Sequence, residues 1–171
     1  MAAGADLVWK KDVQDMSLQF EEKVVGTVTA YRRRRERAVA AVEQSEQMEK
    51  RSVVRFNQIV ESDVIPIFNT TAELLKESCV VQIHRHEYTD ERPFVVSVDM
   101  VITQKPGVRI RRLCQPCPKL EICLKKKTFR VVIFTENLRD ARLLLEEIRL
   151  FELNAEKVEQ CINGFIAEIF R

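Results

Sequence analysis

Glycine and proline are both scarce in this chain, with four glycines and five prolines among 171 residues. The scarcity argues against the glycine-rich loops that cradle phosphates or expose a nucleophile, and no motif of either kind occurs. All five prolines lie between Pro66 and Pro118, so no proline interrupts a helix in the first 65 residues. Long regular elements are therefore expected, above all at the two ends of the chain.

Long apolar runs and a signal segment are missing as well. Apolar runs extend over only a few residues, as at 94–96 and 143–145, so we expect no membrane-spanning helix and no membrane partner. The first residues lack the apolar core of a secretory signal, and the five cysteines are an odd number. These absences predict a cytoplasmic protein whose cysteines are free thiols.

Catalytic residue types are few. The chain has two histidines, and only Glu87, close to the histidine pair, suggests acid–base chemistry. A single exposed glutamate is a weak signal, so we expect no enzyme and no small-molecule substrate.

The apolar residues between Lys11 and Glu61 recur at steps of three and four, which predicts a helix with one apolar stripe. They are Val13, Met16, Phe20, Val24, Val28, Tyr31, Val39, Val42, Val53, Phe56 and Val60. Charged residues interrupt this stripe at Arg32, Arg35, Glu46 and Glu49. The basic run at 32–35 could contact phosphates or an acidic partner, and opposed charges on a neighbouring helix would fix its register. Residues 1–61 are expected to form a helical stalk or a bundle segment.

The last 35 residues, from Asn137 to Arg171, carry a more regular seam of the same kind. Its members are Ala141, Leu144, Ile148, Phe151, Ala155, Val158, Ile162, Phe165 and Ile169. Asn137 is a good N-cap, and the pattern predicts one helix about 50 Å long. Such a seam predicts lengthwise packing on another helix, within one protomer or between protomers.

The middle of the chain reads as a short helix followed by strands. Ser62-Asp63 is the expected cap of a helix that runs through Glu77. From Cys79 the apolar period changes to two, which is typical of strands. Runs of this kind occupy residues 79–86, 94–102, 108–113, 120–124 and 129–133.

Together these segments predict an α+β fold. It consists of a long N-terminal helix, a short helix, a four- to five-stranded antiparallel meander and a long C-terminal helix, with residues 62–171 as one domain. The second helix and part of the last helix should cover the apolar face of the sheet. The order of helix, strands and helix is similar to that of RWD-type modules, which end coiled-coil stalks in some assembly complexes, but no residue motif of that family is present.

One candidate metal site combines two histidines and two cysteines. His84 and His86 alternate along one strand, and Cys114 and Cys117 have ligand spacing in a turn. If the four converged, they would suit a structural zinc ion, whereas the alternative is a solvated pair of histidines and two turn cysteines. No other cofactor is expected, because the Cys-x-x-Cys pair is followed by a strand-like segment and not by the helix of a redox motif.

A candidate phosphate-binding surface lies in the basic middle of the chain. Its members are Arg109, Arg111, Arg112, Lys125, Lys127 and Arg130, with Glu121 as the single acid between residues 109 and 130. Such a face could bind nucleic acid in a salt-dependent way, although stacking aromatic residues are missing. A sheet face whose charges are paired with acids of the same chain explains the pattern equally.

The sequence predicts a protein that associates with other chains and does not catalyse a reaction. We expect a non-enzymatic assembly, adaptor or scaffold protein that associates with itself or a protein partner through coiled-coil-like helices. The nine seam residues between Ala141 and Ile169 are the expected interface. The alternative is a nucleic-acid-binding protein that uses the basic face of the sheet.

Overall fold

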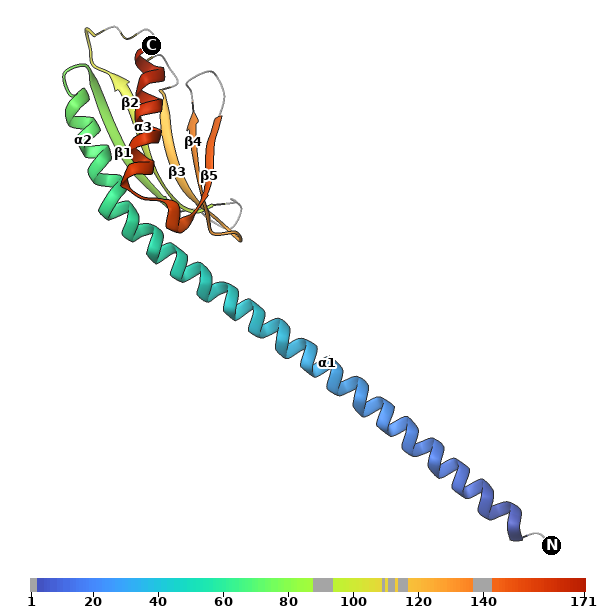
Figure 1. Cartoon of the computed structure of the whole chain (residues 1–171). Helices are drawn as coiled ribbons and strands as arrows, with labels where there is room; N and C mark the ends of the chain where they lie inside the picture. Colours follow the sequence, from blue (N-terminus) through green and yellow to red (C-terminus); the bar gives the residue numbers. More distant parts are fainter. Residues whose placement is uncertain (1–2, 88–93, 109, 111–112, 114–116, 137–142) are drawn as a thin grey trace. The chain divides into compact units, whose positions relative to one another are not determined.

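The computed structural model describes residues 3–87, 94–108, 110, 113, 117–136 and 143–171, and for residues 3–21 it describes the helical backbone alone. The packing divides the chain into two units, Met1–Glu46 and Gln47–Arg171. The described part of the first unit is helical, and the second unit contains a sheet with helices on it (Figure 1).

The N-terminal helices follow one another without an intervening loop. They are α1 (Ala3–Ile59), a π-helical turn η1 (Val60–Val64) and α2 (Ile65–Leu75). In the π turn the N–H of Ile65 donates to the carbonyl oxygen of Val60, one residue further back than in an α-helix. Pro66, which has no N–H to donate, follows in the first turn of α2. The predicted helix start at Ser62-Asp63 is wrong, because the wider turn carries the helix past the proline.

The second unit holds a five-stranded antiparallel sheet whose strand order follows the chain. The strands are β1 (Cys79–Glu87), β2 (Phe94–Gln104), β3 (Lys119–Lys125), β4 (Arg130–Glu136) and β5 (Leu143–Arg149). Apolar side chains pair across neighbouring strands, with Val98 opposite Ile122 and Ile122 opposite Ile133. The predicted α+β class and the antiparallel meander are confirmed.

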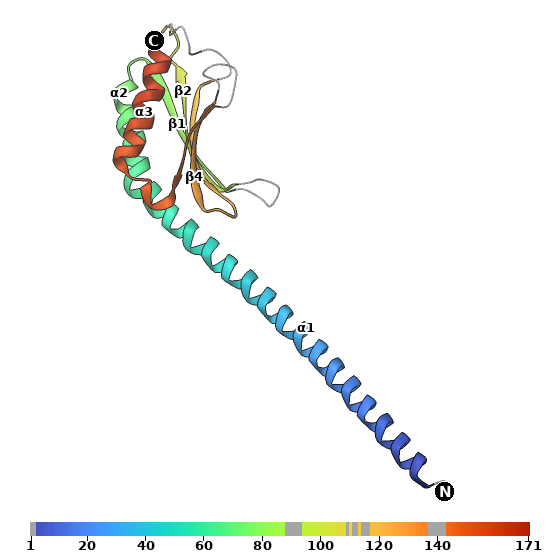
Figure 2. The same ribbon diagram turned by 45° about the vertical axis from the view of Figure 1, so that its right-hand side comes forward.

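The core lies between this sheet and two helices. Figures 1 and 2 show α2 and α3 (Ala155–Phe170) on the same face of the sheet. Phe68 of α2 and Phe165 of α3 are buried against sheet residues that include Ile122 and Ile133. Removing each such side chain from water stabilises the fold by about 1.5–3 kcal/mol. The predicted cover of the apolar face is therefore present.

The core of the second unit begins earlier in the chain than the predicted domain start at residue 62. Phe56, Ile59 and Val60 already belong to it. In the described part of the chain, no helix is both long and apolar enough to cross a bilayer.

One predicted strand is wrong. Val108, Ile110 and Leu113, the described residues of the run 108–113, belong to no strand. A turn precedes them, with the N–H of Val108 donating to the carbonyl of Lys105 at 3.1 Å and Gly107 at a φ of 85°. The described residues of this segment do not form a strand between β2 and β3, because β3 pairs directly with β2.

The predicted single C-terminal helix is also wrong in extent. Residues 143–149 form strand β5, a 3₁₀ turn (Leu150–Glu152) follows, and within the described residues 143–171 only α3 is α-helical. Asn154 caps α3, because its side-chain oxygen accepts a hydrogen bond from the N–H of Lys157 at 2.9 Å. The predicted cap Asn137 lies outside the described residues. The backbone of β4 offers the segment a hydrogen-bonded ladder, and Ile148 opposite Val131 fills the core, which a helix at this place would not do.

Candidate functional site

The predicted helical interface does not exist as one surface. Val158, Ile162, Phe165 and Ile169 lie on α3 and are buried in the core of their own chain. Ile148 is buried too, but it belongs to strand β5.

The other seam residues are scattered. Leu144 of β5 is 56% exposed, Phe151 of the 3₁₀ turn is 70% exposed, and Ala155 is exposed at the start of α3. Ala141 lies outside the described residues. The predicted apolar seam is present on α3, but it packs against the sheet of its own chain and not against another protomer.

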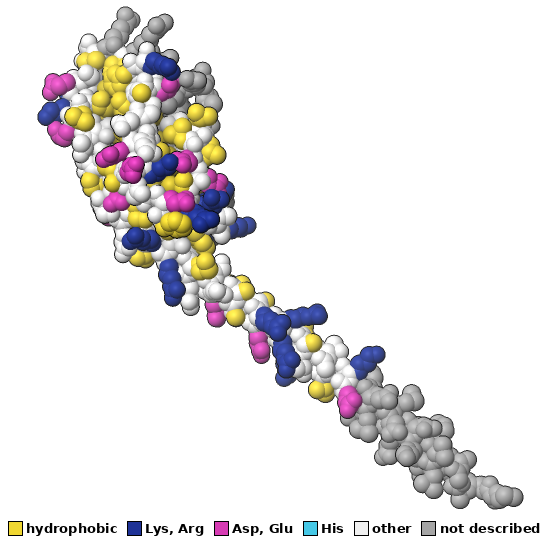
Figure 3. Space-filling view, viewed as in Figure 1, with side chains coloured by type: hydrophobic (Ala, Val, Ile, Leu, Met, Phe, Trp, Pro, Cys, Tyr) yellow, Lys and Arg dark blue, Asp and Glu magenta, His cyan; other side chains and the backbone are white. Residues whose placement is uncertain are grey.

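The exposed helical surface lies instead on α1. Every residue from Glu22 to Met48 is exposed, and exposed hydrophobic, basic and acidic side chains follow the described part of this helix (Figure 3). Val39 and Val42 are 51% and 58% exposed. A helix normally gains most of its stability by burying an apolar face, so an exposed helix of this length is a candidate interface.

One line of residues on α1 alternates apolar and charged pairs. We call it the α1 stripe, and its members are Val28, Arg32, Arg35, Val39, Val42, Glu46 and Glu49. They are spaced by three and four residues and therefore lie along one face of the helix. Among the residues that the structure describes, none of its four charged members forms an ion pair with its own chain.

On the sheet face opposite the helices, two histidines form hydrogen bonds with one buried aspartate. Asp99 of β2 is 3% exposed, and its two oxygens lie 2.9 Å from Nδ1 of His84 and 2.6 Å from Nε2 of His86. Asp99 also stands directly opposite Glu121 of β3, which is 1% exposed. The histidines thus place hydrogen-bonding partners beside one of two adjacent buried carboxyl groups.

Glu121 has its own partners. It accepts a hydrogen bond from Ser97 at 3.0 Å, and Nζ of Lys119 lies 3.2 Å away. Lys119 is also 2.8 Å from Glu136. Burial alone would lower the pKa of Lys119, but the carboxylates of Glu136 and Glu121 outweigh it and raise that pKa.

The predicted zinc ligands are not brought together in the described residues. His84 and His86 share Asp99, Cys117 lies half-buried after β2, and Cys114 lies outside the description. Within the described ranges, no group of three or more histidine, cysteine or acidic side chains is placed to hold a metal ion. The zinc site stays a prediction that depends on Cys114.

Two of the three described members of the predicted basic face are paired with an acidic residue. Glu147 of β5 lies 3.4 Å from Nζ of Lys125 and 3.7 Å from Nε of Arg130. Lys127 is exposed in the β3–β4 turn with a φ of 68°. The remaining members, Arg109, Arg111 and Arg112, lie outside the described residues, so the nucleic-acid alternative now depends on them.

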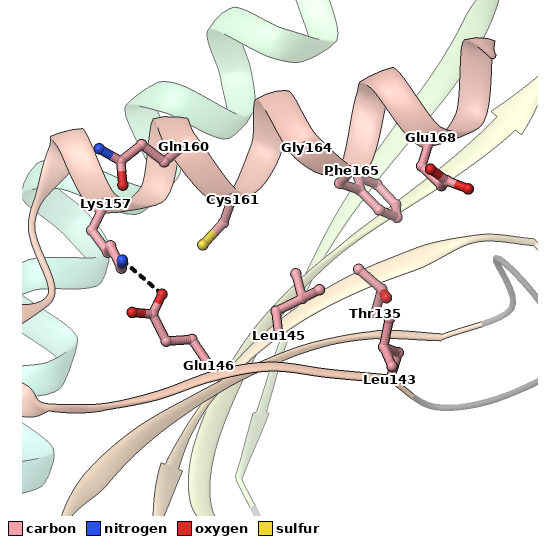
Figure 4. Close-up of a pocket in the computed structure, with 10 residues that line it drawn as sticks. All are labelled: Thr135, Leu143, Leu145, Glu146, Lys157, Gln160, Cys161, Gly164, Phe165 and Glu168. Atoms are coloured by element: carbon pink, nitrogen blue, oxygen red, sulfur yellow. Dashed lines mark ion pairs between the residues drawn. The ribbon is translucent and has the colours of Figure 1, made fainter.

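A pocket of about 530 Å³ lies between α3 and the β4–β5 edge of the sheet. Cys161 and Phe165 point from α3 toward the strands, and Leu145 and Thr135 point back toward α3 (Figure 4). At one end Nζ of Lys157 is 2.7 Å from Glu146. The lining is largely apolar, so the pocket suits apolar groups more than charged ones.

Two polar groups in this pocket have unusual surroundings. The hydroxyl of Thr135, a residue 1% exposed, is buried and has no hydrogen-bond partner among the described residues. Burial, and after it the carboxylate of Glu146, raise the pKa of the Cys161 thiol, which makes it a poor nucleophile. Sequence reasoning missed the pocket because it placed residues 143–149 in a helix, although the alternation of β4 signalled that Thr135 would face the core.

Comparison with protein-family models, curated proteins and solved structures finds no match for this chain.

Proposed function

We propose that this chain is a non-enzymatic assembly protein that associates through helix α1. The observation that carries the proposal is the exposure of Val28, Val39 and Val42 on a helix in which every residue from Glu22 to Met48 is exposed. Apolar residues in a regular line on a long exposed helix are the pattern of a surface that packs on another helix.

The second unit supports this proposal because the apolar seam of its helix α3 is already buried within the chain. The four buried apolar residues of α3 hold the sheet and are not free to meet a partner. The association surface that the sequence assigned to residues 141–169 is therefore proposed for α1. The folded unit would then serve as the module that the associated helices carry.

The test is the mass of the full chain in solution, measured by light scattering over a range of concentrations. We expect an oligomer, and we expect Val39→Asp with Val42→Asp to shift it to single chains, because two carboxylates would have to be buried in the contact. Ala41→Asp, which adds a charge to α1 outside the stripe, is the control and should keep the wild-type mass. A wild-type mass of one chain at every concentration would contradict the proposal.

A further inference from the structure

We propose that α1 pairs with α1 of a second copy in antiparallel orientation, with Arg32 opposite Glu49 and Arg35 opposite Glu46. The inference rests on the proposed function, since it names the partner and the register of the same helix. It is carried by the charge order of the α1 stripe, which is complementary to itself when one copy is reversed.

The complementarity follows from the spacing. In an antiparallel pair related by a two-fold axis, residues at equal distances on either side of the axis face each other. The midpoint of the segment from Arg32 to Glu49 falls between Ala40 and Ala41. Val39 and Val42 are equidistant from it, so two apolar contacts lie at the centre.

The charged residues obey the same symmetry. Arg35 and Glu46 are equidistant from this midpoint, and so are Arg32 and Glu49. Each basic residue therefore meets an acidic one, and the two-fold axis makes every pair occur twice. One step further out, the register places Val28 opposite Val53, which is half-buried against its own core. Pairs of opposite charge inside a helical seam are a known means of fixing register and orientation.

A parallel pair would have the opposite consequence. Each residue would then face its own copy, so Arg32 would meet Arg32, Arg35 would meet Arg35, and both glutamates would meet glutamates. Four layers of like charge would oppose this arrangement, whereas the antiparallel one has none. The segment from Arg32 to Glu49 is about 27 Å long at the rise of an α-helix, enough for several layers of contact.

The surface of the helix is consistent with such a partner. Among the described residues Arg32, Arg35 and Glu46 are exposed and lack an ion pair within the chain. Next to them on the helix, Arg33 and Arg37 carry the same charge but lie off the stripe. These two arginines make it possible to separate the position of a charge from its sign.

The experiment compares the solution mass of full-length variants by light scattering and sedimentation. Arg32→Glu with Arg35→Glu puts glutamate opposite glutamate and should weaken the dimer at least tenfold. Glu46→Arg with Glu49→Arg should do the same with arginines. The fourfold swap that combines both changes restores every opposite pair in an antiparallel dimer and should restore the mass of two chains.

The control Arg33→Glu with Arg37→Glu changes net charge as much as the first variant and should leave the dimer intact. Circular dichroism of each variant separates loss of pairing from loss of folding, because the sheet unit keeps its own signal.

The outcomes distinguish the two proposals. A monomeric wild type overturns both. A wild-type oligomer with an odd number of chains, or one that the reversals do not weaken, overturns the antiparallel pairing and leaves association through α1 in place. Failure of the folded fourfold swap to dimerise likewise overturns the proposed register, since a parallel pair would gain nothing from the swap.

Discussion

Helices α1 and α3 share a period of three and four residues but differ in what covers them. In α3, Val158, Ile162, Phe165 and Ile169 are all buried, whereas from Glu22 to Met48 of α1 no residue is buried. The α3 stripe is purely apolar, and the α1 stripe contains four charges. An uninterrupted apolar stripe is satisfied by any apolar surface, and here its own sheet supplies one. A stripe with ordered charges favours a partner of matching order, which is why we look for it in a second copy.

The largest difference between the two helices should appear on truncation of one stripe residue in each. Ile162→Ala removes a side chain that is 4% exposed and should lower the free energy of unfolding by about 2–5 kcal/mol. Val39→Ala, on the exposed helix, should change the unfolding of the second unit by less than about 0.5 kcal/mol. Chemical denaturation followed through the sheet signal measures both. Equal effects would mean that α1 is as much part of that core as α3.

Removal of one charged group should show the same contrast between the second unit and α1, with a smaller loss of stability. Lys119→Met takes a cation from the buried Glu121 and should cost about 1–3 kcal/mol. Arg34→Met, an exposed charge on α1, should cost almost nothing. The difference is measured from denaturation midpoints at neutral pH, and no loss for Lys119→Met would show that Glu121 is held by its other partners.

The raised pKa of Lys119 also predicts how the stability of the folded chain should change with pH. The pKa of Lys119 is raised in the folded state, so the folded chain holds the proton more tightly than the unfolded chain. Its contribution to stability is complete below the unfolded pKa of about 10.4 and is lost as the pH rises through the higher folded value. Above about pH 10, wild type should therefore lose stability more steeply than Lys119→Met. Parallel slopes would contradict the assignment.

The smallest effect concerns two threonines. Thr135→Val removes a buried hydroxyl that has no hydrogen-bond partner in the described part of the chain, and it should raise the free energy of unfolding by about 1 kcal/mol. Thr27 of α1 is exposed, and its hydroxyl donates to the carbonyl of Lys23 at 2.8 Å, so Thr27→Val should be close to neutral. Thermal unfolding resolves the pair, and no gain for Thr135→Val would show that this hydroxyl finds a partner in solution.

The fold class was predictable because its signals are local. The alternation in residues 94–102 and 120–124 marks β2 and β3 without any knowledge of their neighbours. The steps of three and four mark α1 and α3 in the same way. Residues 143–149 were not predictable, because a leucine-rich segment with two glutamates suits a helix by propensity, and only the pairing with β4 makes it a strand.

The candidate sites, like the fold, were predictable only where their signals are local. The sequence could show that His84 and His86 share one side of a strand, but not that Asp99 lies within hydrogen-bond distance of both. It could show that Lys125 and Arg130 are basic, but not that Glu147 lies between them, because β5 was assigned to a helix. Partners across strands depend on register, and register is set by the whole sheet.

What the sequence determined by itself is therefore which faces are apolar, namely one side of β1 to β4 and the seam of α3, and the order of charges along the α1 stripe. What only the tertiary structure decided is which face meets which. The seam of α3 packs on the sheet, and residues 143–149 form its fifth strand. In this arrangement the backbone groups at the sheet edge form hydrogen bonds, and the apolar side chains above the sheet are buried. From Glu22 to Met48, α1 is not buried against any described part of its own chain.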